Sequence, residues 1–427
     1  MGFRKPHKVL KPQKQPKPSI IMHLRELFLR HVAQTSDIPL GLEIEHAEGS
    51  WLYDTNGKKY LDFIGGISVS SIGHRHPAVV EAIKAQTDKY LHTLVYGEYA
   101  MSPQVELATE LAKSLDPQAL FTEGELASRP ALDSIFFTNS GSEATEGAMK
   151  LAKRFTGRYE IIACRRAYHG STQGAASLMW PKDFTQAYHP LLPGIRHIDF
   201  NDVESLELIS EKTACVIVEP VQAEAGVLPP NLQFLSSLRE RCDETGTLLV
   251  FDEIQTGFGR TGSFWAFEQL DVVPDIILMA KAMGGGMPIG AFAAPREIMK
   301  VLGYDPPLGH ITTFGGHPVS CVASLATLRF LKGSDTIANV KAKEDLLRSK
   351  LIHPKIKEVR SAGLLMAIEV GGFEQLRKVQ MAALGKGVIT DWFLFNDQSL
   401  RIAPPLTIAD EEIEFACNVL LECLDES

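Results

Sequence analysis

The sequence lacks most of the features that mark disulfide-bonded, membrane-spanning and nucleic-acid-binding proteins. Its six cysteines are scattered without a C-x-x-C pair, so we expect neither a disulfide framework nor a metal site. No run of apolar residues reaches the ~18 to 20 positions that a membrane-spanning helix needs. Lysine and arginine number 43 against 52 aspartate and glutamate residues, and the net charge of −9 disfavours a nucleic-acid surface.

The overall composition is that of a globular protein with a large core. Of the 427 residues, 45% are hydrophobic and 22% are charged. This length predicts two or three domains rather than one. Residues 1–21 are rich in lysine and proline and contain no acidic residue, so we predict a basic disordered tail. Met22 opens a helix-like run and is therefore an alternative to Met1 as the start of translation.

Short apolar runs alternate with longer amphipathic stretches along the middle of the chain. The runs that we expect to be strands are 134–138, 161–164, 215–218, 247–251 and 276–279. Strands that are apolar along their whole length and alternate with helices indicate a mainly parallel sheet covered by helices. We therefore predict an α/β fold in which residues 76–328 form a large domain.

The two ends of the chain have a different pattern, which predicts a smaller α+β domain. Residues 44–63 alternate polar and apolar side chains around a turn at Asp54 to Gly57, so we expect two short strands in a hairpin. The C-terminal part combines expected helices at 335–351 and 411–424 with expected strands near 364–370 and 399–403. We predict that residues 22–75 join this small domain, which spans residues 329–427.

Residues 138–144, T-N-S-G-S-E-A, lie where an expected strand ends and an expected helix begins. Small residues at a helix start leave backbone N–H groups available, and the helix dipole adds positive potential, so a phosphate group fits there. A simpler interpretation is that Ser140 or Ser142 only caps the helix, and that interpretation is favoured when the segment is considered alone.

The glycine pattern G-F-G-R-T-G at 257–262 follows an apolar strand and raises the hypothesis of an NAD-dependent dehydrogenase. A dinucleotide site requires the glycine turn to follow its strand directly and to open into a helix. Here residues 252–255 intervene, and the aromatic segment 264–267 follows. The dehydrogenase is therefore a remote alternative.

Asp252 and Lys281 each follow an apolar strand, and the carboxyl ends of strands form the ligand crevice of an α/β sheet. Apolar neighbours lower the pKa of a lysine amine, as a nucleophile that attacks a carbonyl requires. An aspartate at the next strand end can keep a pyridine nitrogen protonated. The pair points to pyridoxal phosphate, although a plain Lys–Asp salt bridge explains these two residues equally well.

Eight short motifs together resemble the class III (ω-) aminotransferases, the acetylornithine and ornithine aminotransferases in particular. They are GISVSSIGHRHP (66–77), NSGSEA (139–144), AYHGS (167–171), VEPVQAEAG (218–226), FDEIQTGFGRTG (251–262), AKAMGGGMPIGA (280–291), TTFGGHP (312–318) and LRIAPPL (400–406). The resemblance covers about residues 43 to 421 and implies a fold-type I pyridoxal phosphate transferase. It also explains the glycine pattern as a family loop.

The resemblance implies roles for the residues around the cofactor ring. Lys281 would bind pyridoxal 5′-phosphate covalently and then carry the proton between substrate and cofactor. Asp252 would pair with the ring nitrogen, and Gln255 would bind the phenolic oxygen. Tyr168 would lie over the ring face, with His169 beside it.

The resemblance also implies how the cofactor phosphate is held. Ser140, Gly141 and Ser142 would surround it at the helix start, and Thr313 would reach it from a second subunit. The active sites of a homodimer, or of a dimer of dimers, would then be shared. Glu219, which precedes a proline, is expected to support the site rather than to react.

Glu224 and Arg401 resemble the family's Glu–Arg switch, in which the glutamate covers the arginine in one half-reaction and releases it for a keto-acid carboxylate in the other. A guanidinium matches a carboxylate in a bidentate way, which suits this role. A plain salt bridge is the alternative. Tyr96 is a candidate pocket aromatic or an interface residue. Ser171 stands where family members that act on ornithine-like substrates usually have a carboxylate-binding arginine, which puts the donor in doubt.

From these residues we expect an aminotransferase of amino-acid metabolism that works by a ping-pong mechanism. It would move the amino group of a small ω-amino acid or diamine to a keto acid, 2-oxoglutarate in the first place, with pyruvate as the alternative. An aminomutase or a dialkylglycine-type decarboxylase of the same fold is the alternative enzyme. We expect a cytoplasmic protein whose partners are small molecules and its own copies, with no nucleic acid or membrane.

Overall fold

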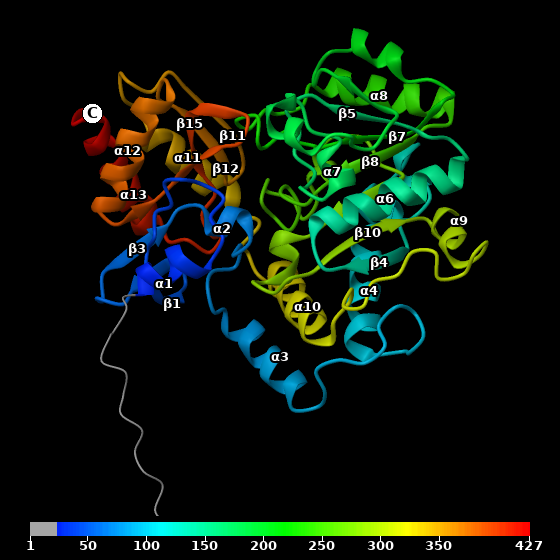
Figure 1. Ribbon diagram of the computed structural model, residues 1–427, viewed down its shortest axis with the longest axis horizontal. Helices are drawn as coiled ribbons and strands as arrows, with labels where there is room; N and C mark the ends of the chain where they lie inside the picture. The colour runs from blue at the N-terminus through cyan, green and yellow to red at the C-terminus, as the bar shows by residue number, and fades with distance from the viewer. Residues whose placement is uncertain (1–23) are drawn as a thin grey trace, which may run out of the picture.

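The structure is a computed structural model that describes residues 24–427 (Figure 1). The tail expected at residues 1–21 and the alternative start at Met22 lie outside the described residues. Across the part of the chain that is described, no helix is both long and apolar enough to cross a membrane.

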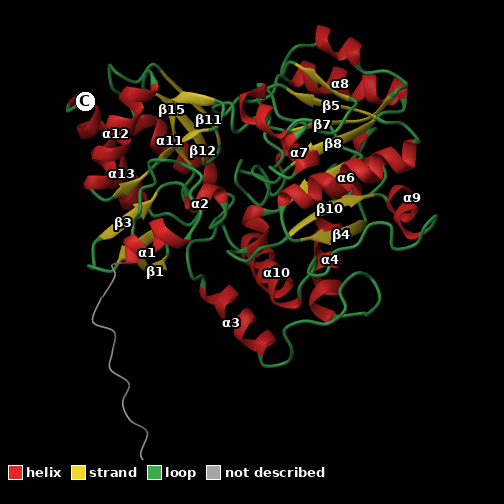
Figure 2. Cartoon of the chain, viewed as in Figure 1, coloured by secondary structure: helices red, strands yellow, loops and turns green. Residues whose placement is uncertain are grey.

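A seven-stranded sheet lies at the centre of the larger part of the molecule (Figure 2). Its strands, in spatial order, are β4 (Ser134–Thr138), β10 (Gly290–Ala294), β9 (Ile276–Met279), β8 (Leu248–Asp252), β7 (Thr213–Val218), β5 (Glu160–Cys164) and β6 (Ile195–Ile198). Strand β10 runs antiparallel to both neighbours, and the other pairs are parallel. The mainly parallel sheet predicted from the apolar runs is confirmed.

Helices cover both faces of this sheet, which explains why its strands are apolar along their length. On one face, Leu249 and Phe251 of β8 belong to a hydrophobic cluster that includes α8 (Leu232–Thr245). On the other face, Leu248 and Val250 pack in a cluster with α6 (Gly141–Thr156). Successive side chains of a strand point to opposite faces, so every residue of β8 is buried.

Two four-stranded sheets form the smaller part of the molecule. One contains, in order, β1 (Ile44–Glu48), β2 (Trp51–Asp54), β3 (Lys59–Asp62) and β13 (Val388–Ile389). The other contains β11 (Glu358–Ala362), β12 (Leu365–Glu369), β15 (Asn396–Ile402) and β14 (Asp391–Phe393). The first and last thirds of the chain therefore share a sheet, while the domain boundaries at residues 76 and 329 stay a prediction.

The hairpin expected at residues 44–63 is present, but it has three strands rather than two. Asp54 forms the turn between β2 and β3, and its Oδ1 accepts hydrogen bonds from the backbone N–H groups of Asn56 and Lys58, both at 2.9 Å. An additional turn at Gly49 precedes β2 and allows β1 to pair with it. The positive φ of Gly49, 56°, suits such a turn.

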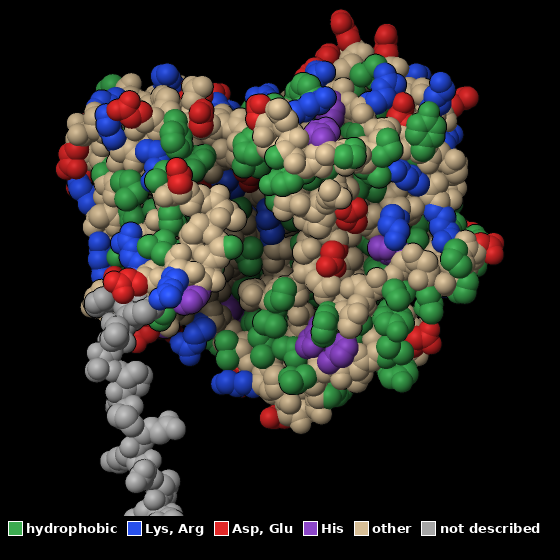
Figure 3. Space-filling model, in the orientation of Figure 1, with side chains coloured by type: hydrophobic (Ala, Val, Ile, Leu, Met, Phe, Trp, Pro, Cys, Tyr) green, Lys and Arg blue, Asp and Glu red, His purple; other side chains and the backbone are tan. Residues whose placement is uncertain are grey.

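The remaining helices connect and cover the sheets. They are α1 (Leu24–His31), α2 (Gly65–Ser68), α3 (Pro77–Thr87), α4 (Ser102–Ser114), α5 (Pro117–Leu120), α7 (Gln173–Ala176), α9 (Arg296–Met299), α10 (Pro318–Gly333), α11 (Val340–Lys350), α12 (Phe373–Gly385) and α13 (Asp410–Asp425). Helices α11 and α12 pack on α13, and α3 packs on α10. The face of the molecule that Figure 3 shows is hollowed between the larger part, with the seven-stranded sheet, and the smaller part, with the two four-stranded sheets.

Candidate active site

A cavity of about 430 Å³ lies at the carboxyl ends of β8 and β9, beside the start of α6. Its wall includes eight residues that the sequence nominates: Ser140, Gly141, Ser142, Tyr168, His169, Asp252, Gln255 and Lys281. Glu219 and several apolar residues, among them Val69 and Met287, complete the wall. The crevice thus forms at the sheet edge where ligands of α/β proteins bind.

Lys281 is the first residue after the turn that ends β9. Its backbone has a φ of 46°, a left-handed conformation that is uncommon outside glycine and that aims the side chain into the cavity. The Nζ atom donates a hydrogen bond of 2.7 Å to Oε1 of Gln255. Burial lowers the pKa of Lys281, and the carboxylate of Glu224 opposes this shift. The amine is therefore closer to its nucleophilic, uncharged form than an exposed lysine.

Asp252 ends β8 and forms a buried pair with His169, whose Nδ1 lies 2.6 Å from Oδ2. Burial lowers the pKa of His169, but the hydrogen bond and charge of Asp252 outweigh burial and raise it. The Nε2 atom of the same ring is buried without a partner. Glu219 holds the backbone next to His169 in place. Its carboxylate accepts hydrogen bonds from the backbone N–H groups of Tyr168 at 3.1 Å and Ala223 at 3.0 Å.

The start of α6 forms a narrow cradle. Ser140 is the N-cap, and its Oγ accepts the backbone N–H of Glu143 at 3.3 Å, as the simpler capping interpretation requires. Gly141 and Ser142 are the first helical residues, whose N–H groups have no acceptor within the helix. A Cβ atom at Gly141 would lie 2.7 Å from Cδ1 of Ile254, so a larger residue there would require the Ile254 side chain to move. Capping and anion binding are therefore compatible here.

Glu224 and Arg401 come together although they are far apart in the sequence. Nη1 of Arg401 donates to Oε1 of Glu224 at 2.8 Å, and Nη2 donates to Oε2 at 3.0 Å. Both side chains are buried, with 3% and 9% of their surfaces exposed for Arg401 and Glu224. The pair lies outside the cavity wall, but the charge of Glu224 acts on Lys281. This geometry suits both the switch and the plain salt bridge.

A second carboxylate on Arg401 was not expected from the sequence. Oδ1 of Asp391 lies 3.0 Å from Nε of Arg401, at an angle outside hydrogen-bond range, so the contact is an ion pair. The two residues are register partners in the β14–β15 pair. The acidic residue Asp391 at the start of the segment D-W-F-L-F-N-D could have suggested a partner for an arginine. The sequence does not reveal, however, how this segment pairs with β15.

Tyr96 and Thr313 are placed apart from this cavity within the single chain. Tyr96 lines a different cavity of about 260 Å³, together with Thr312 and Phe137. Thr313 is exposed. Their proposed roles in substrate and phosphate binding therefore stay predictions that require a second copy of the chain.

The glycine pattern at 257–262 forms turns and does not open a helix. Arg260 in its middle is fully buried and donates hydrogen bonds to the carbonyl oxygens of Leu364 at 3.0 Å and Pro404 at 2.6 Å. Glu253 accepts the backbone N–H groups of Ala266 and Phe267 at the end of the loop. The pattern thus joins the two parts of the molecule.

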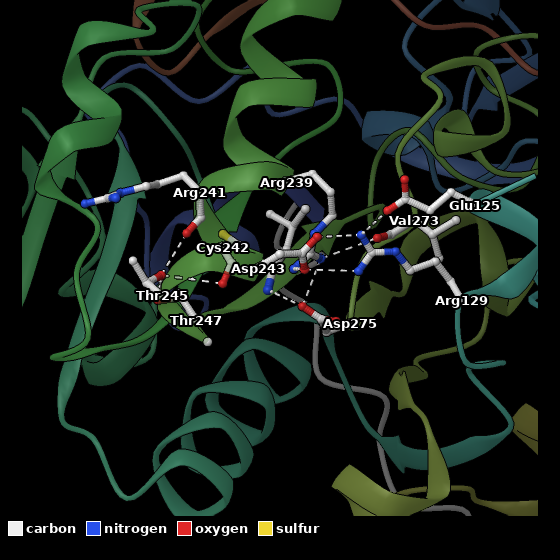
Figure 4. Close-up of polar contacts among 12 residues, drawn as sticks. Glu125, Arg129, Arg239, Arg241, Cys242, Asp243, Thr245, Thr247, Val273 and Asp275 are labelled. Atoms are coloured by element: carbon white, nitrogen blue, oxygen red, sulfur yellow. Dashed lines mark hydrogen bonds and ion pairs between the residues drawn. The ribbon is translucent and has the colours of Figure 1, made fainter.

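The stretch 120–132 contacts α8 through Arg129 (Figure 4). Nη1 of Arg129 donates to Asp243 of α8 at 3.0 Å, and Arg239 of α8 links Asp243 to Asp275. Asp275 directly precedes β9, so this cluster lies at the amino end of that strand, opposite Lys281.

Comparisons with known proteins agree with this geometry. The sequence pattern of the family described as aminotransferase class-III matches residues 32–424. The chain belongs to the class-III aminotransferases. The chain is 39% identical to the acetylornithine aminotransferase of Methanopyrus kandleri, over 95% of this chain and 100% of that protein. It is 35% identical to the [LysW]-aminoadipate semialdehyde/glutamate semialdehyde transaminase of Sulfolobus acidocaldarius, over 90% and 95% of the two chains.

Solved structures of class-III aminotransferases have the same fold. An ornithine aminotransferase from Toxoplasma gondii, crystallised with oxidised glutathione, superposes with a TM-score of 0.82 and 30% identity, covering 93% of each chain. That structure shows partial occupancy of pyridoxal phosphate at the active site. The present chain is thus a pyridoxal-phosphate-dependent aminotransferase with a fold-type I architecture.

The cavity fits the cofactor of a class-III aminotransferase. Lys281, with its lowered pKa, would hold the aldehyde carbon, and Asp252 would hold the ring nitrogen. The Nε2 atom of His169 and the Nε2 atom of Gln255 are buried polar atoms without partners on the cavity wall. The cradle at Gly141 would receive the phosphate, and a Cβ atom at Gly170 would close it, at 2.3 Å from Oγ of Ser142.

Proposed function

We propose that this enzyme transfers the amino group of a small ω-amino acid or diamine to 2-oxoglutarate by a ping-pong mechanism. The observation that carries the proposal is the buried, bidentate pair of Glu224 and Arg401, whose charges act on Lys281. A guanidinium covered by a movable carboxylate can present two different surfaces, one for an amine donor and one for an acceptor with a carboxylate.

In the first half-reaction the protein orients the donor and moves one proton. Nζ of Lys281 would take the proton from the carbon that carries the donor amine and hold it within the cavity. Pyridoxal phosphate, when bound, would supply the electron sink. The carboxylate of Asp252, fixed by His169, would pair with the ring nitrogen. Glu224 covers Arg401 meanwhile, so that no uncompensated cation faces a donor without a carboxylate there.

In the second half-reaction Arg401 binds the acceptor. Glu224 gives up its two hydrogen bonds, and the released Nη1 and Nη2 atoms bind a carboxylate of 2-oxoglutarate. Nζ of Lys281 returns the proton in the opposite direction. Pyruvate, which also carries a carboxylate, is the alternative acceptor.

Ser171 limits the donor. Its side chain is exposed, and its backbone N–H donates to Oγ of Ser142 at 3.4 Å. A hydroxyl cannot form a charge-assisted pair with a carboxylate, so we expect a donor whose far end is less strongly anchored than an α-carboxylate held by arginine. Relatives named for acetylornithine and ornithine support an ω-amine as the reacting group.

We also propose that the working enzyme is a homodimer, or a dimer of dimers, in the cytoplasm. Thr313 is exposed, and Tyr96 lies outside the cavity that contains Lys281. Both placements would be explained if each residue completes the site of a second copy. All six cysteines are free and buried, which suits a reducing compartment.

The test is the visible absorbance of the purified, cofactor-loaded enzyme mixed separately with N-acetylornithine, ornithine, 4-aminobutyrate, putrescine and lysine. We expect one donor to remove the absorbance of lysine-bound cofactor, and 2-oxoglutarate to restore it. An absorbance change that needs no external keto acid for full turnover would instead favour the aminomutase or the decarboxylase. The absence of any cofactor absorbance would refute the role of Lys281.

A gain-of-function variant sharpens the assignment of the donor. We expect Ser171→Arg to raise kcat/KM for N-acetylornithine relative to putrescine by about tenfold, because only the former has an α-carboxylate. Ser171→Lys, which adds a charge without the bidentate fork, is the matched control and should give a smaller gain. An unchanged ratio in both variants would place this position outside the donor site.

A further inference from the structure

Two carboxylates contact the guanidinium of Arg401 from different sides. Glu224 binds its two terminal nitrogens, and Asp391 lies 3.0 Å from Nε. The side chain of Asp391 is 23% exposed, whereas that of Arg401 is 3% exposed. A simple salt bridge would need only one of these carboxylates.

The segment that follows Asp391 contacts both members of the Glu–Arg pair. The carbonyl oxygen of Trp392 accepts a hydrogen bond of 2.8 Å from Nη2 of Arg401. The ring of Phe393 lies under the guanidinium, with 4.7 Å between the ring centre and Cζ. The backbone N–H of Leu394 donates to Oε2 of Glu224 at 2.9 Å. The hairpin of β14 and β15 therefore fixes both the arginine and the carboxylate that covers it.

The contacts of Arg401 divide into two groups when Glu224 moves away. Those with Asp391, Trp392 and Phe393 remain, because they come from the same small sheet as Arg401 itself. Nη1 and one hydrogen of Nη2 lose their acceptors and face the position that Glu224 has left. This set of donors matches one incoming carboxylate.

The charges around Arg401 agree with this division between contacts that remain and contacts that are lost. Burial raises the pKa of Asp391 to about 6, an effect that Arg401 opposes and that Glu224 and Asp62 reinforce. Asp391 is therefore mainly ionised at neutral pH. With a substrate carboxylate in place of Glu224, the guanidinium still contacts two carboxylates, so the local charge is unchanged by the exchange.

We infer that Asp391 is a positioning residue that holds Arg401 in its binding orientation while Glu224 gives way to the carboxylate of the keto acid. The inference rests on the proposed function, because it takes Arg401 to be the acceptor site. Asp391 is not part of the wall of the cavity that contains Lys281. Its effect is on how well a carboxylate binds, and not on proton transfer at Lys281.

The direct test is the binding of glutarate to the cofactor-loaded enzyme, measured by titration calorimetry. Glutarate has the two carboxylates of 2-oxoglutarate but no carbonyl group, so it cannot react. We expect Asp391→Ala to weaken glutarate binding about tenfold, because the guanidinium of Arg401 loses its second counter-charge and its side chain can rotate. We expect Asp391→Asn to weaken it by a similar factor, because the contact is an ion pair and the amide is neutral.

Steady-state kinetics give a second readout. Asp391→Ala should raise the KM for 2-oxoglutarate about tenfold and leave kcat and the KM for the amine donor within about twofold. Asp397→Ala is the matched control, since Asp397 is an exposed carboxylate on the same hairpin. It should leave all of these quantities unchanged.

The outcomes separate this inference from the proposed function. If Arg401→Ala leaves glutarate binding unchanged, the acceptor site is not at Arg401 and the proposed function fails. If Arg401→Ala weakens binding but Asp391→Ala does not, only the role of Asp391 is overturned. Tighter binding of glutarate by Asp391→Ala would also overturn it, because simple repulsion between carboxylates would then dominate. Equal losses in both half-reactions would indicate a merely structural residue.

Discussion

Two clusters of arginine and carboxylate groups lie on opposite sides of the molecule, and their compositions differ. Around Arg401, two buried or half-buried carboxylates contact one guanidinium. At the amino end of β9, two arginines, Arg129 and Arg239, alternate with two aspartates (Figure 4). The first cluster has a carboxylate in excess. In the second, Asp243 is shared by both arginines, Asp275 binds Arg239, and Glu125 lies 3.4 Å from Arg129.

We expect the first cluster to exchange a partner and the second to hold the fold together. Asp243 bridges two arginines in the second cluster, so removing it weakens the neutralisation of both, which is costly for the largely buried Arg239. Removing Glu224 from the first cluster leaves Arg401 still paired with Asp391. We therefore expect the contact of Glu224 with Arg401, and not the contacts of the second cluster, to open during the reaction.

The largest effect should come from Lys281, which belongs to the active side of the molecule and to neither cluster. We expect Lys281→Ala to lower kcat by more than about a thousandfold, because the proton transfer loses its only positioned base. The melting temperature should stay near that of the native enzyme. Lys212→Ala, at an exposed turn, is the control and should retain full activity. Residual turnover above about one per cent in Lys281→Ala would remove the assigned role.

The next effect concerns the cluster that holds the fold together. Arg239→Ala should lower the free energy of unfolding by about 3 kcal/mol, because Asp275 and Asp243 lose a largely buried partner. Arg129→Ala should cost about 1 kcal/mol or less, because its partners are more exposed. Denaturant unfolding measures both values, and kcat should not change. A loss of activity without a loss of stability would contradict the comparison.

Two buried glutamates extend the comparison to pH. Burial raises the pKa of both Glu219, on the cavity wall, and Glu253, behind the 257–267 loop, to about 7. Between the ordinary glutamate pKa and about 7 the folded state holds a proton that the unfolded state has lost, so stability falls as pH rises through this window. The free energy of unfolding should therefore fall by about 2 kcal/mol less between pH 5 and pH 7 in Glu253→Gln than in the native enzyme.

The two glutamates should differ in their effects on activity. Glu219→Gln should change the pH dependence of kcat, because the charge of Glu219 acts on His169 and Lys281. Glu253→Gln should leave that dependence unchanged, since Glu253 contacts only Thr256 and the backbone of Ala266 and Phe267. Matching shifts of the activity profile in both variants would show that the two carboxylates are not functionally distinct.

The smallest effect is expected at Glu224, because Arg401 keeps Asp391 when Glu224 is removed. Glu224→Ala should lower kcat/KM for the amine donor roughly tenfold and leave the keto-acid half-reaction equal or faster. Stopped-flow absorbance measures the two half-reactions separately. An unchanged ratio of the two rates would refute the switch, and a loss of stability as large as that of Arg239→Ala would make it a plain salt bridge.

Much of the architecture follows from local sequence patterns. The expected strand 276–279 coincides with β9, and 134–138 coincides with β4, because each is a short apolar run bounded by turn residues. Strand β10 was missed, since it lies in a small-residue segment, G-A-F-A-A, that has little β-propensity. The helix expected from residue 335 begins at Val340, after a turn in which the backbone N–H of Asn339 bonds the carbonyl of Asp335.

Some residues of the site could likewise be predicted from the sequence, and others could not. Lys281 and Asp252 could be found from the sequence, because both follow apolar strands whose ends meet at one edge of a parallel sheet. Asp391 could not, because its role depends on the pairing of a three-residue strand with β15, which is a tertiary contact. The structure of a single chain likewise cannot bring Thr313 to a site that it would enter from a second copy.

The parallel pairing of β3 with β13 has a consequence for the synthesis of the chain. The backbone N–H of Leu61 bonds the carbonyl of Gly387 at 2.8 Å, and that of Phe63 bonds the carbonyl of Ile389 at 3.1 Å. Strands β1 to β3 leave the ribosome early, but their partner strand emerges only when the chain is nearly complete. Until then one edge of β3 has no backbone partner and can pair with other unfinished chains. Nascent chains should therefore need protection at this edge until β13 arrives.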